Sequence, residues 1–368
     1  MAMSFEEYVN AYYGGVLGIS KRYGIKKAED VLTTADTAYF NTMYGASVFH
    51  QLNTKSEVFK LLPKEGWTQS GWRVLKTRGA SASNAGVAEG AAFPETDVPD
   101  LDTVVATIKE IVTPWDVSTR AEFLSEADDG VKGLTAYLRR EQAEHHAFYI
   151  DAMMMVTAST ADGNNFESLD RITLSNARCA VAPYSAGEND IYDLDRTVDT
   201  WSNAYTDSAS NTDKDLELGF MDSAIQSALE NGANYDDLIF LTNHAVLQDI
   251  KALVNVSSNA TWRYDLGPMG QGTTRNGATS EAGMNLDSRV GYYDSIPIFV
   301  TQHVTGVDNR LYLLDMAHLK MKLAAPTTYV ANEDLGILQK LAKEYAYITA
   351  GELICTKFTT QGSIRDLN

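Results

Sequence analysis

Two strand-like segments flank a long loop in WRVLKTRGASASNAGVAEGAAFPETDVPDLDTVVATIKEIV, residues 72–112. Residues 72–78 mix apolar and basic positions, and residues 104–112 are rich in β-branched side chains, so both are predicted strands. The residues between them, 79–100, are rich in Ala, Gly and Ser and include Pro94 and Pro99. A loop of this length exceeds any ordinary hairpin connection and is usually functional or disordered. We therefore expect an arm that reaches a neighbouring subunit.

A long helix is predicted directly after this region, from about Ser125 to Ala158. Leu134, Leu138 and His145 are among the residues that recur at steps of three and four along it. Polar and apolar faces that continue over about 30 residues are typical of a long spine helix with one exposed side.

The remaining sequence alternates between helical and strand-like patterns. Helices are expected at residues 4–23, 28–61, 220–230, 243–254 and 335–345. Strands are expected at residues 237–242, 292–302, 310–315 and 347–358. Residues 159–215 are expected to form loops and short elements, and residues 257–290 a long surface loop. The predicted fold class is therefore α+β, with segregated elements.

Composition narrows the classes of protein to consider. The chain has 368 residues, 44% of them hydrophobic, which is large for one core and favours two lobes. Its formal net charge of −19 repels nucleic acid at long range, so a dedicated nucleic-acid binder is not expected. Acidic surfaces with few lysines also suit high salt, which leaves a halophilic archaeal host as one alternative. Cys179 and Cys355 are expected to be buried reduced thiols.

No run of 18 apolar residues is present, so no transmembrane helix is expected. The first residues, MAMSFEE, lack the basic-then-apolar pattern of a signal peptide. We therefore expect a protein that is made and assembled in the cytoplasm, without a membrane partner.

Several sequence motifs resemble chemical sites, but each is incomplete or common by chance. Glu141 and His145 share one helix face, but the zinc-protease pattern of two His four residues apart around a Glu is absent. GPMGQG at 267–272 lacks the Lys-Ser/Thr of a phosphate loop, and no Gly-x-Ser-x-Gly nucleophile motif occurs. Asn255 and Asn259 begin glycosylation sequons, a triplet that is common by chance. We predict no catalytic, cofactor or metal site, and hence no enzyme.

The order of these segments resembles the Hong Kong 97 type major capsid proteins of tailed viruses. The sharpest match is VAEGAAFP at 87–94, followed by the strand at 104–112 and by STRAEFL at 118–124, which leads into the spine helix. Further pieces in the family's order are DGNNFESL at 162–169, DLIFLTNH at 237–244, and Gly291 followed by IPIFV at 296–300. The resemblance covers roughly residues 70–368 and is less clear before residue 70.

The resemblance implies a capsid fold with an N-terminal arm, an extended β-hairpin loop, a long spine helix, and peripheral and axial domains. The implied bounds are 1–70 for the arm, 71–120 for the extended-loop hairpin, 121–177 with 325–368 for the peripheral domain, and 178–324 for the axial domain. The loop is expected to contact a neighbouring subunit through Val87, Glu89, Phe93, Pro94 and Val98. Its acidic groups are expected to meet Arg139 and Arg140 of the spine helix.

The implied function is that of a structural subunit, which assembles into pentamers and hexamers of an icosahedral virion shell around double-stranded DNA without sequence-specific binding. Other copies of the chain are the main partners, and portal, scaffold or decoration proteins are further ones. Some family members cross-link a loop lysine to a neighbour's asparagine, but residues 79–108 contain no lysine, so cross-linking is not expected. Two alternatives stay open: an encapsulin-like compartment with a protein cargo, and an unrelated enzyme.

Overall fold

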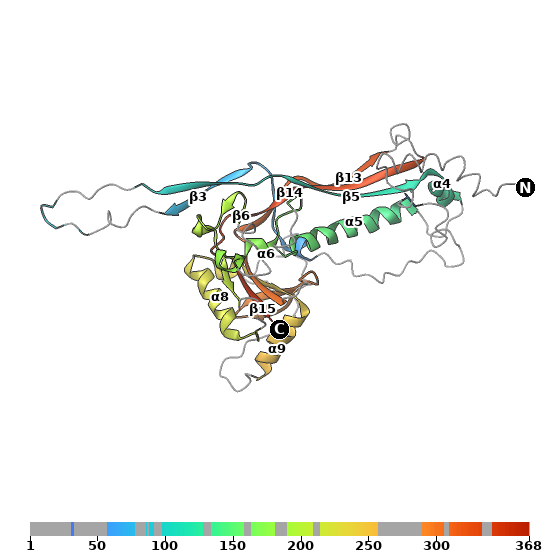
Figure 1. Ribbon diagram of the computed structural model, residues 1–368. Helices are drawn as coiled ribbons and strands as arrows, with labels where there is room; N and C mark the ends of the chain where they lie inside the picture. The colour runs from blue at the N-terminus through green and yellow to red at the C-terminus, as the bar shows by residue number, and fades with distance from the viewer. Residues whose placement is uncertain are drawn as a thin grey trace, which may run out of the picture. The chain divides into compact units, whose positions relative to one another are not determined.

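The computed structural model describes residues 31–32, 57–77, 86, 88–91, 98–127, 134–157, 163–180, 190–208, 214–256, 289–304, 309–332 and 341–367 (Figure 1). The chain divides into two compact units. Unit 1 takes its described residues from 31–32, Val112–His146 and Thr327–Ile348. Unit 2 takes its described residues from Lys55–Ile111, Ala147–Pro326 and Thr349–Asn368. None of the helices among the described residues is long and apolar enough to cross a membrane.

A five-stranded sheet has the order β1-β5-β14-β13-β2. Its strands are β1 (Val31–Leu32), β2 (Lys64–Gly66), β5 (Lys109–Ser118), β13 (Leu319–Asn332) and β14 (Ala342–Cys355). Buried and exposed side chains alternate along the first half of β5, where Ile111 and Thr113 are buried. This period of two is typical of a strand that is covered on one face.

In unit 1, the helices α4 (Thr119–Ala127) and α5 (Leu134–Met154) follow β5, and α5 continues into unit 2. The apolar side of α5 contributes Leu134 and Leu138 to a buried cluster. The other buried members of this cluster are Val117, Ala121 and Tyr345. Next to it, Trp115 stacks on Tyr345 and Tyr347 at ring-centroid distances of 5.7 and 5.3 Å. These aromatic contacts pack side chains of the neighbouring strands β5 and β14 against each other within unit 1.

Unit 2 contains the hairpin of β3 (Gly71–Thr77) and β4 (Asp100–Val105), which are antiparallel. It also contains a six-stranded sheet in the order β10-β11-β9-β12-β15-β8. The strands of that sheet are β8 (Tyr205–Asp207), β9 (Leu238–Thr242), β10 (Arg289–Tyr293), β11 (Ile296–Val300), β12 (Asn309–Asp315) and β15 (Gly362–Leu367). All residues of β9, β11 and β15 are buried, because both faces of this sheet are covered.

Two amphipathic helices, α8 (Leu218–Glu230) and α9 (His244–Val256), pack on the six-stranded sheet. Their buried residues recur with the helical period, as with Met221, Ile225 and Ala228 on α8. Asn243 caps α9, because its side-chain oxygen accepts a hydrogen bond from the Val246 amide at 2.9 Å.

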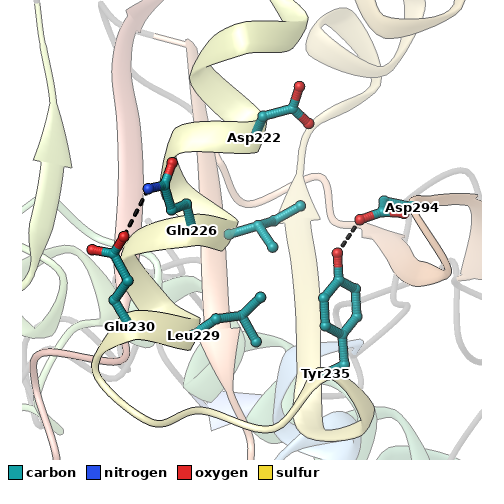
Figure 2. Close-up of a pocket in the computed structure, with 7 residues that line it drawn as sticks. Asp222, Gln226, Leu229, Glu230, Tyr235 and Asp294 are labelled. Carbon is teal, nitrogen blue, oxygen red and sulfur yellow. Dashed lines mark hydrogen bonds between the residues drawn. The ribbon is translucent and has the colours of Figure 1, made fainter.

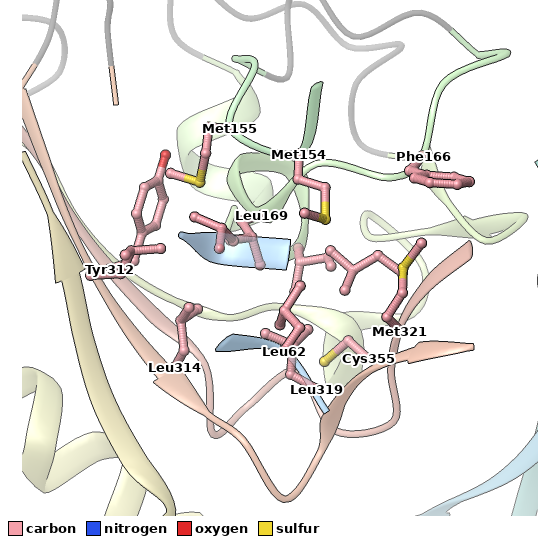
Figure 3. Close-up of a cluster of buried hydrophobic side chains, with 14 of the residues drawn as sticks. Leu62, Met154, Met155, Phe166, Leu169, Tyr312, Leu314, Leu319, Met321 and Cys355 are labelled. Carbon is pink, nitrogen blue, oxygen red and sulfur yellow. The ribbon is translucent and has the colours of Figure 1, made fainter. Parts of the chain in front are cut away.

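A second buried apolar cluster in unit 2 contains side chains of α5, of the six-stranded sheet and of the strands β13 and β14 (Figure 3). Met154, Met321 and Cys355 are among its members. Shorter elements complete the unit. They are α3 (Val58–Leu61), α6 (Leu169–Ile172), α7 (Asn176–Cys179), β6 (Asp190–Ile191), β7 (Leu194–Asp195) and the 3-10 helices η6 (Thr200–Ser202) and η7 (Tyr235–Asp237). Cys179 and Cys355 are both buried, as predicted.

Most predicted elements are confirmed, with shifted bounds. The strand predicted at 104–112 is divided between β4 and β5, and the strand predicted at 292–302 between β10 and β11. Within the bounds predicted for the spine helix, residues 125–127 form the end of α4 and residues 134–154 form α5, while residues 155–157 are not helical. The helix predicted at 4–23 and most of the loop predicted at 257–290 lie outside the described residues.

Two predicted helices are wrong in part. Residues 31–32, inside the helix predicted at 28–61, form β1 and pair with β5, although Val58–Leu61 is helical as predicted. Residues 342–345, inside the helix predicted at 335–345, begin the long strand β14. Ala, Lys and Glu favour helix locally, but β14 lies between β5 and β13, and pairing with both strands overrides that preference.

Candidate assembly surface

The β3/β4 hairpin has two faces of different character. Trp72 and Val74 pack against the apolar cluster of unit 2, and Val104 is fully buried within it. The opposite face carries Leu75 and Leu101, which are partners across the hairpin. The strand period of two therefore places one apolar set toward the subunit and another toward solvent.

The outward set is unusually apolar for a solvent-facing surface. Leu75 is 48% exposed, Leu101 60% and Val105 47%. Val98 and Ile108, which lie just outside β4 in sequence, are 76% and 46% exposed. Apolar side chains gathered in this way are typical of a surface that another molecule covers. We therefore regard Leu75, Leu101 and Val105 on the outer face of the hairpin, together with the exposed flanking residues Val98 and Ile108, as the candidate assembly surface.

Two of the five predicted contact residues on the loop are described. Glu89 is exposed in a turn in which Gly90 has φ +81°, a backbone region that favours glycine. Val98 belongs to the candidate assembly surface. Val87, Phe93 and Pro94 lie outside the described residues. The contact of all five with a neighbouring subunit stays a prediction.

The two predicted spine arginines are neighbours on the exposed side of α5. The guanidinium of Arg139 lies 4.1 Å from the ring centroid of Tyr329, and the guanidinium of Arg140 lies 5.8 Å from that of Tyr137. Each arginine therefore has an aromatic neighbour within unit 1, which the sequence did not reveal. Their pairing with acidic loop residues of another copy stays a prediction.

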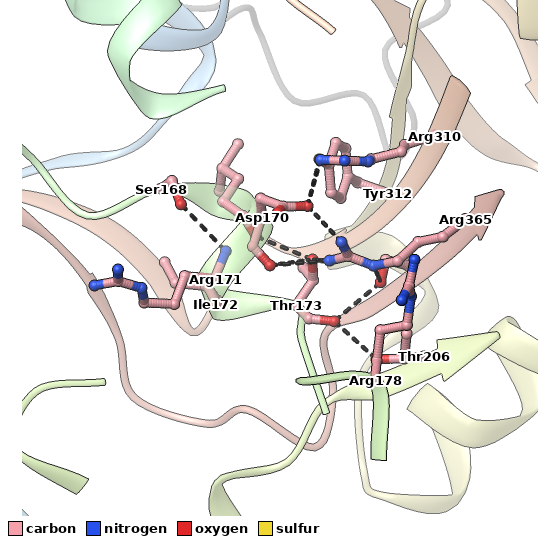
Figure 4. A network of polar contacts seen from close by, with 12 residues as sticks. Ser168, Asp170, Arg171, Ile172, Thr173, Arg178, Thr206, Arg310, Tyr312 and Arg365 are labelled. Atoms are coloured by element: carbon pink, nitrogen blue, oxygen red, sulfur yellow. Dashed lines mark hydrogen bonds and ion pairs between the residues drawn. The ribbon is translucent and has the colours of Figure 1, made fainter. Parts of the chain in front are cut away.

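A buried ionic network lies elsewhere in unit 2, centred on Asp170 of α6 (Figure 4). Its carboxylate accepts hydrogen bonds from Arg310 of β12 at 2.8 Å and from Arg365 of β15 at 2.6 Å. The hydroxyl of Tyr312 donates to the same carboxylate at 3.1 Å. Burial raises the pKa of Tyr312 above its ordinary value. Two cations around one carboxylate satisfy buried charge, and we assign the network a structural role.

The acid Glu352 on β14 is buried in a second polar cluster of unit 2. Its carboxylate pairs with Lys109 at 2.8 Å and accepts a hydrogen bond from the Glu167 amide at 2.6 Å. Burial raises the pKa of Glu352 to about 7, although Lys109 opposes this shift. Glu352 therefore titrates near neutral pH, and its contacts are all with neighbouring structural groups.

A shallow cleft of about 310 Å³ lies beside α8 (Figure 2). Ile225 and Leu229 line it together with polar residues of α8, with Tyr235 and with Asp294. The hydroxyl of Tyr235 donates a hydrogen bond to Asp294. No Ser, Thr, Cys, Lys or His side chain is among the residues that line this cleft. Among the described residues, no group of three His, Cys, Asp or Glu side chains could hold a metal ion, and that includes Glu141 and His145.

Comparison with known proteins finds similar solved structures but no matching sequence. No family model and no curated protein matches the sequence. Among solved structures, the capsid asymmetric unit of cyanophage A-1(L) is similar over 88% of this chain and 95% of its own, with a TM-score of 0.62 and 13% identity.

Two other capsids are similar at lower scores. The capsid of an empty GTA particle is similar over 87% of this chain and 99% of its own, with a TM-score of 0.54 and 10% identity. The mature capsid of bacteriophage PhiM1 is similar over 92% of this chain and 95% of its own, with a TM-score of 0.50 and 11% identity. All three similarities span nearly the whole chain. The chain therefore has the α+β capsid fold of the Hong Kong 97 type that its sequence predicted.

Proposed function

We propose that this chain is the major capsid protein of a tailed virus. Its copies form pentamers and hexamers of an icosahedral shell that encloses double-stranded DNA. The role is structural rather than enzymatic. The protein is assembled in the host cytoplasm and resides in the virion, with portal, scaffold or decoration proteins as further partners. One observation carries the proposal beyond the fold: the candidate assembly surface leaves five apolar side chains exposed on or beside a hairpin whose other face is already packed.

The hairpin supplies the contact between copies in this proposal. Fully burying one Leu or Val side chain contributes roughly 1.5–3 kcal/mol, so covering side chains that are about half exposed contributes about half of that each. The loop residues Val87, Glu89, Phe93, Pro94 and Val98 extend the same contact. Arg139 and Arg140 supply positive charge for the acidic loop of the neighbouring copy. Each contact joins two different patches, and contacts of that kind close into rings.

Electron microscopy and sedimentation of the purified protein test the assembly itself. Closed shells or rings are the expected product. Monomer alone, across all salt and protein concentrations, would contradict the proposal. Shells that enclose a protein cargo rather than DNA when isolated from their natural source would favour the encapsulin-like alternative.

A loop replacement separates assembly from folding. An Asn-Gly turn in place of residues 80–97 should leave β3 and β4 paired, because this dipeptide suits a tight hairpin. We expect native circular dichroism without shells. Normal shells from this variant, or failure to fold, would show that the loop has a different role.

A further inference from the structure

Lys76 is the inward-facing side chain of β3 nearest to the loop within the described residues. It makes two ion pairs, one with Asp102 of β4 at 2.6 Å and one with Asp199 at 3.1 Å. Asp199 does not belong to the hairpin, because it immediately precedes η6. The two carboxylates raise the pKa of Lys76 above its ordinary value. One cation therefore joins the two strands of the hairpin to each other and to a separate segment of the subunit.

A second contact reaches the hairpin from the same segment. Tyr192 stands at the tip of the β6/β7 turn, where it has φ +50° and Asp193 has φ +62°. Its ring meets the edge of Trp72 of β3 at a centroid distance of 5.5 Å. Its hydroxyl donates to the Leu353 carbonyl of β14 at 2.6 Å, which fixes the ring against the five-stranded sheet. A positive φ is costly for a non-glycine residue, and this packing offsets that cost.

These contacts hold the hairpin at two points along its length. Trp72, with Val74 and Val104, anchors the end that packs on the apolar cluster of unit 2. Asp199 holds the hairpin closer to the loop, through Lys76. A two-stranded hairpin is marginally stable by itself, so its direction depends on what its inner face contacts. Without the ion pair between Lys76 and Asp199, the hairpin could pivot about Trp72.

We infer that residues 190–202 act as a clamp that sets the direction of the hairpin, with Tyr192 and Asp199 as its positioning residues. The inference rests on the proposed function, because the direction of the hairpin decides where the candidate assembly surface meets the next copy. Asp199 and Tyr192 contact the inner face, so they act on assembly through the hairpin and not by touching the neighbouring copy.

Asp199→Asn is the sharpest test, because it removes the charge and keeps the size. Asp193→Asn is the matched control: it makes the same charge change on an exposed residue of the same segment, and Asn also tolerates positive φ. Hydrogen exchange of the β3 and β4 amides in unassembled subunits measures the clamp, and light scattering with micrographs measures assembly. Thermal unfolding checks the fold.

For Asp199→Asn we expect amide exchange in β3 and β4 to be about two- to fivefold faster, as the loss of a partly exposed ion pair would give. Assembly should be slower and the shells less uniform, with an unchanged unfolding temperature. Asp193→Asn should match the wild type in all three measurements. Lys76→Met removes the cation from the other side of the pair and should reproduce the result, so it decides the matter if Asp199→Asn does not fold.

Wild-type exchange in both Asp199→Asn and Lys76→Met would overturn the clamp, as would faster exchange with wild-type assembly. Failure of the wild type itself to assemble would instead contradict the proposed function. The exchange measurement would still report on the clamp, since it uses the unassembled subunit.

Discussion

Arg365 donates a hydrogen bond to the carboxylate of Asp170 at 2.6 Å, although 195 residues separate the two in sequence. Arg310 still pairs with Asp170 when Arg365 is removed, but the Asp170 carbonyl and the Thr173 hydroxyl lose a buried hydrogen bond from Arg365. The loss of such a buried donor costs about 1–3 kcal/mol, and more when the donor is charged. We therefore expect Arg365→Met to lower the free energy of unfolding by that amount in chemical denaturation. Lys320→Met is the control, because Lys320 pairs with Glu65 at 3.6 Å on the surface and should cost less than about 1 kcal/mol. Equal effects of the two changes would refute a structural role for the network.

Leu101→Ser tests the candidate assembly surface. Leu101 is 60% exposed, so the variant should keep nearly the wild-type unfolding temperature as a subunit. Each contact between copies should weaken by about 1 kcal/mol, which raises the protein concentration that shells require. Leu341→Ser is the control, since Leu341 is 78% exposed and lies outside both the hairpin and the clamp at residues 190–202. Sedimentation showing the same assembly threshold for Leu101→Ser and wild type would remove this surface from the contact.

The pH dependence of stability should carry a contribution from Glu352. Its pKa is about 7 in the folded chain, against an ordinary value of 4.5, so the folded state holds the proton more tightly. Between these pH values the free energy of unfolding should fall as pH rises, by up to about 1.4 kcal/mol per pH unit. The contribution is fully present below pH 4.5 and is lost above pH 7.

Glu352→Gln removes this titration. The free energy of unfolding of the variant minus that of the wild type should be larger at pH 8 than at pH 5. Unfolding of the subunits with denaturant at the two pH values measures this difference. Glu65→Gln, on the exposed strand β2, corrects for the loss of one charge. A difference between variant and wild type that is the same at both pH values would speak against the raised pKa.

Salt should stabilise the assembled particles. Every subunit carries a formal net charge of −19, and a closed shell brings many such subunits together. The screening length falls from about 10 Å at 0.1 M salt to about 3 Å at 1 M, which weakens repulsion between like surfaces. Particles should therefore melt at a higher temperature in 2 M than in 0.1 M salt. Calorimetry showing equal or lower melting temperatures at high salt would exclude this effect.

The shell should not be covalently cross-linked, because residues 79–108 contain no lysine. Boiled particles on a denaturing gel should run as one band near 40.4 kDa. A ladder of larger species would show that another lysine serves as the donor.

The sequence predicted the elements whose local pattern agrees with their final surroundings. β9 begins with the apolar run LIFL and lies within a covered sheet, and α8 repeats its apolar residues with the helical period. The two strands around the long loop were also predictable, because Gly, Ser and two Pro residues between them disfavour both helix and strand. Their outer face was missed, although Leu75, Leu101 and Val105 alternate with the inward-facing residues.

Among the strands that were not predicted, β13 and β15 show how tertiary contacts decide secondary structure. GSIRDL in β15 combines turn-forming residues with charged ones, yet all six are buried. Their charges are compensated by partners far away in sequence, since Asp170 pairs with Arg365 and Arg178 with Asp366 at 2.9 Å. β13 contains two lysines and a proline, which obscure its alternation. Neither the compensating charges nor the neighbouring strands can be read from a local window of sequence.

The position of β15 also has a consequence for the timing of synthesis. It lies between β12 and β8, and it pairs antiparallel with the first and parallel with the second. Translation proceeds from the N-terminus, so the ribosome must reach residue 367 before all six strands of this sheet can pair. A nascent chain therefore cannot offer a finished subunit to other copies. In the proposed assembly, the fold thus delays recruitment of the polypeptide into a particle until its last described strand has been made.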